Sequence, residues 1–296
     1  MVKRKLAGAE TKPGGLSYLA LVGALVFALF PIYWMGMTSI KPLPEWTASP
    51  PVWITSNPTA INYEILFTPT GLVGTEFGFA FEQFEPAQRA ILDSAITAGL
   101  GTILAITVGL LAAIGVSRHR IGGNFMPMFI LSARMVPPVV AMIPLVILYS
   151  NIGLIDTHLG LILAYGLFTA PYSLWMIKSF IDDIPKELEE RAQVDGLSTL
   201  GAHFKVTVPL IKGGVAATAL FLLILNWSEF LLALTLTHGG VLTIPRQASL
   251  YFLGVSGVLY GPQSAIGLVA TVPLFVFAFV IQRYLVRGLT FGAIKR

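Results

Sequence analysis

Six runs of nearly uncharged, apolar residues follow one another along the chain, and each is long enough to cross a membrane as a helix. A bilayer core of about 30 Å requires about 20 apolar residues of α-helix. The runs are Leu16–Ile40, Ser94–Val116, Phe125–Tyr149, Leu159–Ile177, Gly213–Leu236 and Ser264–Val286. A membrane β-barrel would instead show segments of about ten residues with alternating polarity. The pattern therefore predicts an all-α, polytopic membrane protein with six transmembrane helices.

The composition of the chain excludes a water-soluble domain. Of its 296 residues, 55% are hydrophobic and only 11% are charged, against roughly 25% charged residues in soluble domains. The mean hydropathy is +0.78. The absence of cysteine excludes a disulfide framework, a thiolate metal site and cysteine catalysis. A net charge of +4 is weak support for a nucleic-acid partner, and we expect none.

Positive charges are distributed unevenly between the two sides of the predicted membrane domain. Fifteen of the nineteen Lys and Arg residues lie on the side of the N-terminus, whereas Lys41, Arg89 and Arg246 lie on the other side. Loops that carry the excess of positive charge are cytoplasmic. We therefore expect a cytoplasmic N-terminus over residues 1–15, a transmembrane domain over 16–286 and a cytoplasmic tail over 287–296.

Two connections between the apolar runs are long. The predicted extracytoplasmic loop, residues 41–88, is rich in Pro, Thr and Phe and is expected to be irregular. It serves either as a spacer or as a docking surface for an outer partner. The second connection, residues 178–212, is predicted to be cytoplasmic.

The 178–212 loop is predicted to form two short helices. Pro185 suits the start of the first helix, Gly196 can end it in the left-handed conformation, and Ser198 can cap the second. Pro209 then leads into the fifth apolar run. The pattern alone leaves two functions open: a helical knob that inserts into a groove of a soluble partner, or an amphipathic loop on the lipid surface.

A motif in this loop resembles the "EAA" loop of ABC importer permeases. Glu190-Arg191-Ala192 is followed after three residues by Gly196, and after nine more by Val206-Thr207-Val208-Pro209. The family pattern is Glu-Ala-Ala, three residues, Gly, nine residues, Ile, any residue, Leu-Pro, and the spacing matches throughout. Arg191, Val206 and Val208 depart from it. Asp195 before Gly196 is typical of the carbohydrate branch.

The resemblance extends along most of the chain. Short segments resemble the second membrane subunit of maltose-type sugar permeases: Met135–Val140, Ile143–Leu145, Gly153–Thr157, Leu188–Glu190, Asn226–Phe230 and Gly288–Gly292. The resemblance implies a permease subunit for a sugar or related polyol in a bacterial or archaeal cytoplasmic membrane. The resemblance also implies a transport subunit that is not an enzyme and carries no cofactor. The residues implied in contact with the ATPase are Glu190, Arg191, Ala192, Asp195, Gly196 and Pro209.

The energy source of such a permease is a separate protein. The chain has no Gly-x-x-x-x-Gly-Lys-Ser/Thr phosphate loop; Gly196 and Gly201 have the glycine spacing, but Ala202 and His203 follow. The resemblance implies a heterodimer with a second permease subunit, two cytoplasmic ATPase subunits and an extracytoplasmic solute-binding protein. Membrane lipid surrounds the complex.

Polar residues inside the predicted spans are the candidates for a solute path. Arg134 lies near the middle of the third run, directly before a Pro-Pro pair, and serves either the kink or the path. Asn226, Trp227 and Glu229 belong to a polar cluster in the fifth run. Sugars are bound by hydrogen-bonding groups beside aromatic faces, so this cluster suits a sugar, although polar contacts between helices are the alternative.

Other chemistry has little support in the sequence. The four His residues show no metal-ligand spacing, and each is expected in a loop; no Ser/His/Asp arrangement is legible. The basic end at 288–296 suits contact either with anionic lipid or with the ATPase. An ion-coupled secondary transporter is the alternative function, and it would require acidic residues in mid-membrane, where Glu229 is the sole candidate. A membrane scaffold protein is a further alternative.

Overall fold

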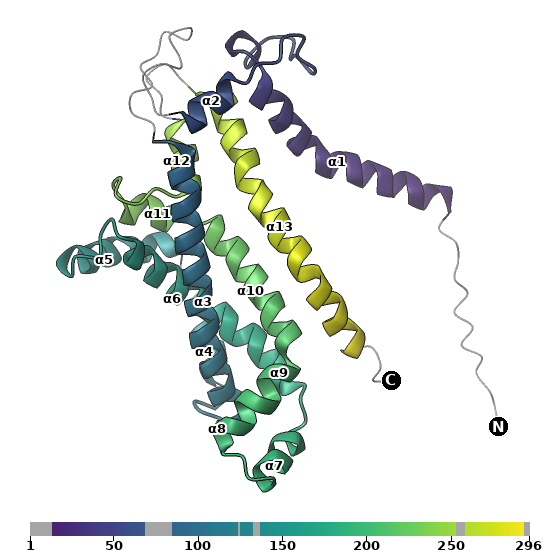
Figure 1. Cartoon of the computed structure of the whole chain (residues 1–296), viewed down its shortest axis with the longest axis vertical. Helices are drawn as coiled ribbons and strands as arrows, with labels where there is room; N and C mark the ends of the chain where they lie inside the picture. Colours follow the sequence, from purple (N-terminus) through teal and green to yellow (C-terminus); the bar gives the residue numbers. More distant parts are fainter. Residues whose placement is uncertain (1–13, 69–84, 124, 133–136, 253–257, 293–296) are drawn as a thin grey trace.

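The computed structural model describes residues 14–68, 85–123, 125–132, 137–252 and 258–292, and these residues are mostly helical with no strand among them (Figure 1). The all-α prediction is confirmed. The helical elements are α1 (Gly15–Ile40), η1 (Leu43–Glu45), α2 (Ile61–Phe67), α3 (Ala87–His119), α4 (Phe125–Ser132), α5 (Pro138–Asn151), α6 (His158–Asp182), α7 (Glu187–Val194), α8 (Thr199–Ala202), η4 (His203–Thr207), α9 (Val208–Leu210), α10 (Lys212–Trp227), α11 (Leu231–Leu236), α12 (Ile244–Leu250) and α13 (Tyr260–Gly292).

Four helices in the described part of the chain are long and apolar enough to cross a membrane: α1, α3, α6 and α13. They match the first, second, fourth and sixth apolar runs. A fifth crossing is formed only if Thr199–Leu210 and α10, which meet at an angle of 74°, are counted together. The chain is therefore a multi-pass membrane protein.

The third and fifth apolar runs are not unbroken helices. The third divides into α4 and α5, because neither proline of the Pro137-Pro138 pair has an N–H to continue a helix; Arg134 and Met135 lie outside the described residues. In the fifth, α10 ends at Trp227 and α11 begins at Leu231. The Pro-Pro pair of the third run thus interrupts the helix at the place where a kink was expected, whereas the break in the fifth run was not expected.

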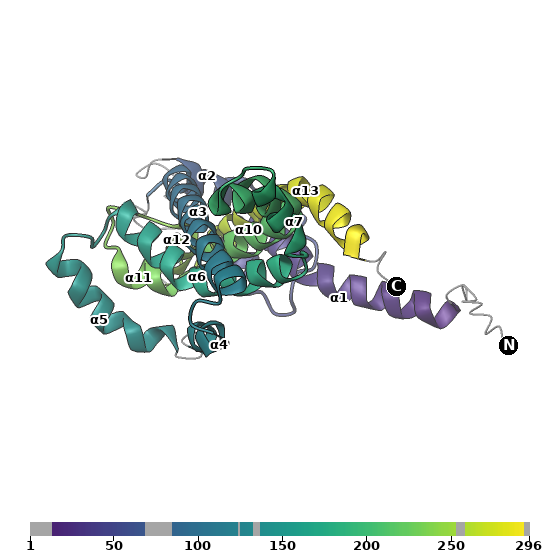
Figure 2. The same cartoon turned by 90° about the horizontal axis from the view of Figure 1, so that it is seen from below.

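Small residues bring α3 and α6 into close contact. A Cβ atom added to Gly109 of α3 would lie 2.2 Å from Ser173 Oγ of α6, and one added to Gly101 would lie 2.9 Å from Tyr165 Cβ. A Cβ atom added to Gly166 of α6 would likewise lie 2.6 Å from Leu104 Cδ2 of α3. Glycines at such an interface allow two helix backbones to approach closely in a membrane. α3 and α6 therefore form the central pair of the bundle, which Figure 2 shows from below.

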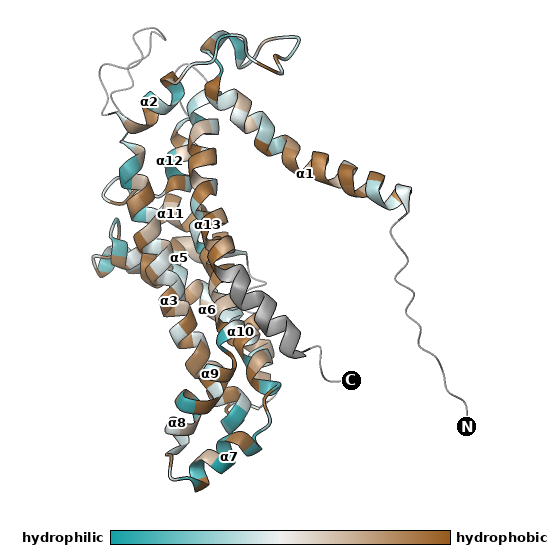
Figure 3. Ribbon diagram, turned by 45° about the vertical axis from the view of Figure 1, so that its right-hand side comes forward, coloured by the Kyte–Doolittle hydropathy of each residue, from teal (hydrophilic) through white to brown (hydrophobic). Residues whose placement is uncertain are grey.

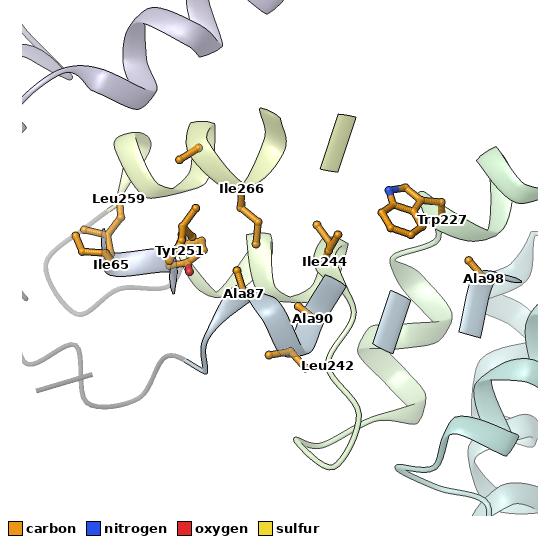
Figure 4. Packing of buried hydrophobic residues seen from close by; sticks show 12 residues of the cluster. Ile65, Ala87, Ala90, Ala98, Trp227, Leu242, Ile244, Tyr251, Leu259 and Ile266 are labelled. Atoms are coloured by element: carbon orange, nitrogen blue, oxygen red, sulfur yellow. The ribbon is translucent and has the colours of Figure 1, made fainter. Parts of the chain in front are cut away.

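The two ends of the bundle carry different elements. The 178–212 loop, with α7 to α9, lies at one end, and α2 and α12 lie at the other (Figure 1). A buried apolar cluster at the α12 end joins α2, α3, α12 and α13 (Figure 4); its labelled members include Ile65, Ala87, Tyr251, Leu259 and Ile266. The predicted irregular loop 41–88 thus includes a packed helix, α2, whose Asn62 donates hydrogen bonds to the carbonyls of Ser39 and Lys41.

The first helix diverges from the bundle. α1 meets α2 and α13 near its C-terminal end, and its N-terminal half stands apart (Figures 1 and 3). The apolar side chains of that half are exposed, among them Leu16, Phe27 and Val26. Because such an apolar surface is unfavourable in water, it is suited to lipid or to another subunit.

Candidate functional site

The 178–212 loop forms the two short helices that the sequence predicts. α7 ends before Gly196, which has a φ of +95° and therefore takes the left-handed conformation that glycine adopts without strain. Ser198 Oγ then accepts a hydrogen bond of 3.1 Å from the Gly201 N–H and caps α8. A π-helical turn, His203–Thr207, connects α8 to α9.

One face of this loop is fully open to solvent. Glu190, Arg191 and Asp195 are exposed, and so are the apolar side chains of Val194 (87%) and Leu200 (66%). Among the other residues implied in ATPase contact, Gly196 and Pro209 are exposed and Ala192 is partly buried. Exposed apolar groups surrounded by charges are typical of a surface that a protein partner covers.

The opposite face of the loop holds a buried acid, Glu189. Arg118 Nε at the end of α3 lies 2.8 Å from Glu189 Oε1, and the two side chains are only 5% and 6% exposed. The hydroxyl of Thr207 donates to the same oxygen, and His203 Nδ1 lies 3.3 Å from Oε2. Arg118 also donates a hydrogen bond of 3.0 Å to the carbonyl of Ile184. Glu189 thus joins α7, the π-helical turn and α3.

Two histidines extend this group. Nε2 of His119, the last residue of α3, lies 3.2 Å from Nε2 of His203. In neutral histidine one ring nitrogen donates and the other accepts. One of the two Nε2 atoms therefore donates to the other, while Nδ1 of His203 lies near Glu189 Oε2 without a hydrogen bond of good geometry. Only His238 lies in a loop as expected: His119, His158 and His203 lie in helical segments.

The charges of this group are set by burial and by its partners. Burial would raise the pKa of Glu189, but hydrogen bonds from Thr207 and Arg118, together with the Arg118 charge, outweigh burial and lower that pKa. Burial lowers the pKa of His203, and the neighbouring Glu189 charge only partly opposes this. At neutral pH the group therefore holds an ionised Glu189 and a neutral His203.

Sequence reasoning missed the residues of this group. Glu189 and Glu190 are adjacent acids on a short polar helix, and the motif directed attention to Glu190, which is exposed. The available signal was the spacing of Glu189 and Ala192, which are three residues apart and so share a helix face. The partners Arg118 and His119 lie far away in the sequence, and the pattern contains nothing that pairs them with Glu189.

A second candidate site is a cavity of about 390 Å³ beside the break between α10 and α11. Tyr165, Phe168 and Thr169 of α6 line one wall. The other wall is formed by Ile224, Leu225, Asn226, Ser228, Glu229, Phe230, Leu231 and Leu232. The lining combines aromatic rings with an amide, a hydroxyl and a carboxylate.

Glu229 explains the break at this cavity. Its carboxylate accepts hydrogen bonds from the backbone N–H groups of Leu231, Leu232 and Ala233, at 3.1, 2.9 and 3.3 Å. These N–H groups belong to the first turn of α11, which has no carbonyl partners for them. The apolar pattern placed Glu229 inside a membrane helix. In the structure it caps the start of a new helix, α11.

The remaining candidates for the solute path lie in different places. Asn226 is buried beside the cavity; its Nδ2 donates a hydrogen bond of 3.1 Å to Thr102 Oγ1 of α3, and its Oδ1 has no partner among the described residues. Trp227 points away from the cavity and donates from Nε1 to the Ala270 carbonyl of α13, at 3.0 Å. The structure thus brings Asn226 and Glu229 together and separates Trp227 from them, while Arg134 lies outside the described residues.

A third polar group holds a connection at the α12 end. Asp93 of α3 accepts a hydrogen bond of 2.8 Å from the Leu242 N–H and one of 2.7 Å from His158 Nε2. Asp156 accepts from the N–H groups of His238, Gly240 and Val241. These acids fix the residues that connect α11 to α12, which we call the 237–244 segment. Among the described residues no group of three or more possible ligands could hold a metal ion.

Comparison with known proteins places the chain in a family. A family profile described as "Binding-protein-dependent transport system inner membrane component" matches residues 105–291. The trehalose/maltose transport system permease protein MalG of Thermococcus litoralis is 32% identical over 284 residues, which cover 94% of this chain and 96% of that protein. The probable ABC transporter permease protein y4oR of Sinorhizobium fredii is 32% identical and covers 90% of each chain.

A solved structure supports the same fold. A bacterial ABC transporter involved in the import of the acidic polysaccharide alginate matches with a TM-score of 0.67 and 19% identity, over 91% of this chain and 95% of that one. The predicted ABC permease family is confirmed, and so is the prediction of a transport subunit that is not itself an enzyme. The chain belongs to the family of inner membrane components of binding-protein-dependent transport systems.

Proposed function

We propose that this chain is one of two different membrane-spanning permease subunits in an ABC importer for a sugar or related polyol. Relatives that match over more than nine tenths of the chain are named as permeases for trehalose/maltose and for trehalose. The complex would also contain two cytoplasmic ATPase subunits and an extracytoplasmic solute-binding protein. We place both termini and the 178–212 loop on the cytoplasmic side, where the positive charges predict them, and the 237–244 segment on the outer side.

The observation that carries the sugar assignment is the cavity at the α10–α11 break. A sugar ring has polar edges and apolar C–H faces, and the cavity combines Phe168 and Tyr165 with the amide of Asn226. The unpartnered Oδ1 of Asn226 would accept a hydrogen bond from a sugar hydroxyl. Beside the cavity, Glu229 accepts three backbone hydrogen bonds from α11 and so fixes the start of that helix.

Replacing Asn226 tests the cavity. We expect Asn226→Ala to raise the KM for uptake of radiolabelled trehalose or maltose by the reconstituted complex about tenfold, because one good hydrogen bond contributes about 1 kcal/mol or more. Asn62→Ala is a matched control: Asn62 is equally buried, donates from Nδ2 and has an unpartnered Oδ1, but lies away from the cavity. Equal KM values for the two variants would contradict the assignment.

The exposed face of the 178–212 loop would receive the ATPase. Glu190 and Arg191 supply charge, and Val194 and Leu200 supply apolar surface to be covered. We expect Glu190→Lys to abolish co-purification of the ATPase subunits. Glu64→Lys makes the same charge change on an exposed residue of α2, at the other end of the bundle, and should leave co-purification unchanged. Uptake that continues without any ATPase would instead support the ion-coupled alternative.

A further inference from the structure

α3 contacts all three polar groups described above, as one helix that no proline interrupts. Of the four long apolar helices, α1, α6 and α13 each contain an internal proline, and α3 does not. An internal proline removes a hydrogen bond and kinks a helix. With 33 residues, α3 is about 50 Å long at 1.5 Å per residue. It is therefore suited to transmit a displacement along its length.

At the α7 end, the 178–212 loop contacts α3 although the two are not neighbours in the sequence. The chain leaves α3 at His119 and returns to this region only through α6. Arg118 makes the buried part of this contact, to Glu189 at 2.8 Å and to the Ile184 carbonyl at 3.0 Å, and the neighbouring Ser117 and His119 contact Asp182 and His203. Both charged side chains are buried, so separating them would leave an unpaired charge at high cost. A displaced loop would therefore take α3 with it.

The other contacts of α3 lie at the cavity and at the α12 end. Thr102 accepts the hydrogen bond from Asn226, about 24 Å along the helix from Arg118. Asp93 and Ser94, about 38 Å from Arg118, accept the N–H groups of Leu242 and Ile244, at 2.8 Å each. The same helix, α3, thus contacts the proposed solute cavity through Thr102 and binds the 237–244 segment through Asp93 and Ser94.

We propose that α3 carries the movement of the 178–212 loop to the cavity and to the 237–244 segment, and that Glu189 is the positioning residue through which the loop holds α3. The inference rests on the proposed function, because the ATPase supplies the movement. The competing route is the chain itself: the loop continues directly into α10. That route contains the 74° bend before Lys212, whereas the route through Glu189 enters a helix without an internal proline.

The test uses the whole complex and ATP as the probe. Because the chain has no cysteine, His238→Cys provides the only cysteine of this subunit, exposed on the 237–244 segment, for a fluorophore; the unsubstituted complex, treated with the same reagent, gives the label on the other subunits. ATP binding should change the fluorescence of this label. We expect Glu189→Gln to reduce that change at least about fivefold, the lower limit for a typical coupling between sites, while ATPase co-purification and basal ATP hydrolysis persist. Glu187→Gln, the same change on an exposed acid of α7, should leave the response intact.

Each outcome decides between distinct claims. A full label response in Glu189→Gln would overturn the role of α3 and leave the proposed function standing. Loss of ATPase co-purification in this variant would also overturn it, because Glu189 would then only fold the docking surface. Arg118→Lys keeps the charge but loses the guanidinium fork, so an intermediate response is expected; a wild-type response would again contradict the proposal. The proposed ATPase docking fails if Glu190→Lys retains the ATPase subunits, and the proposed sugar cavity fails if Asn226→Ala and Asn62→Ala have equal KM values.

Discussion

The two ends of α3 are both held by buried or partly buried polar groups, but by different kinds of contact. At the α7 end, side chains meet side chains: Arg118 and His203 both contact Glu189. At the α12 end, Asp93 of α3 accepts the backbone N–H of Leu242 in the 237–244 segment, and Asp156, between α5 and α6, accepts further N–H groups of the same segment. The side-chain contacts at the α7 end, which we call the α7 joint, depend on which residues are present and on their protonation. The contacts at the α12 end depend on the backbone of the 237–244 segment and not on its side chains.

The two arginines of α3 show the same contrast. Arg118 is 5% exposed and pairs with one acid at 2.8 Å. Arg89 is 38% exposed, lies 3.3 Å from Glu85 and 3.8 Å from Asp93, and donates to the carbonyls of Gly239 and Gly240. Solvent can replace the partners of Arg89 but cannot reach Glu189 as easily. The α7 joint is therefore the more sensitive to substitution.

Arg118→Ala should have the largest effect on stability. It leaves the carboxylate of Glu189 buried without its cation, at a cost of about 3–5 kcal/mol. Arg89→Ala, on the same helix, should cost no more than about 1 kcal/mol, because exposed ion pairs contribute little. Thermal unfolding of the two variants in detergent measures the difference. Equal losses would show that burial does not distinguish the two ends.

Asp156→Ala should have an intermediate effect. It removes the acceptor of three backbone N–H groups. Those of His238 and Gly240 are exposed and can bond to water, whereas that of Val241 is partly buried, and leaving it without a partner costs about 1–3 kcal/mol. Backbone hydrogen bonds lower the pKa of Asp156 although burial opposes this, so its carboxylate is ionised at neutral pH. His238→Ala should change thermal unfolding very little, since His238 contributes its backbone N–H. A larger loss in His238→Ala than in Asp156→Ala would contradict the distinction between backbone and side-chain joints.

This contrast also explains what the sequence could predict. Local chemistry identified the helices of the 178–212 loop, because the left-handed Gly196 and the cap at Ser198 act on their immediate neighbours. Apolar runs located four of the long helices. Hydropathy alone did not show that the helix of the fifth run breaks, because the run is apolar on both sides of Glu229. The break arises because the Glu229 carboxylate caps the first turn of α11.

The partners of the buried acids could not be predicted in the same way. Glu189 and Arg118 are 71 residues apart, and Asp93 and Leu242 are 149 apart. A single sequence contains no signal that pairs such positions. The motif directed attention to Glu190, which is exposed. The adjacent Glu189 was overlooked because a buried acid depends on contacts that only the fold supplies.

Acidification should have the smallest effect, and it should act on the α7 joint. His203 faces Glu189 of α7 and Arg118 and His119 of α3. Burial lowers its pKa in the folded chain below the ordinary 6.5, despite the opposing Glu189 charge. The unfolded chain therefore binds the proton first, so the contribution of His203 to stability is complete above about pH 6.5 and is lost as the pH falls.

Thermal unfolding at pH 7.5 and 5.5 tests this expectation. Asp156, with a pKa lowered from 3.8, stays ionised over that range, so its backbone contacts persist. The unfolding temperature of the wild-type chain should fall between the two pH values, and that of His203→Gln should fall less. His238→Gln, at an exposed histidine, should follow the wild type. If His203→Gln shows the wild-type pH dependence, the α7 joint does not sense protonation at His203, and its sensitivity lies in the Arg118–Glu189 pair alone.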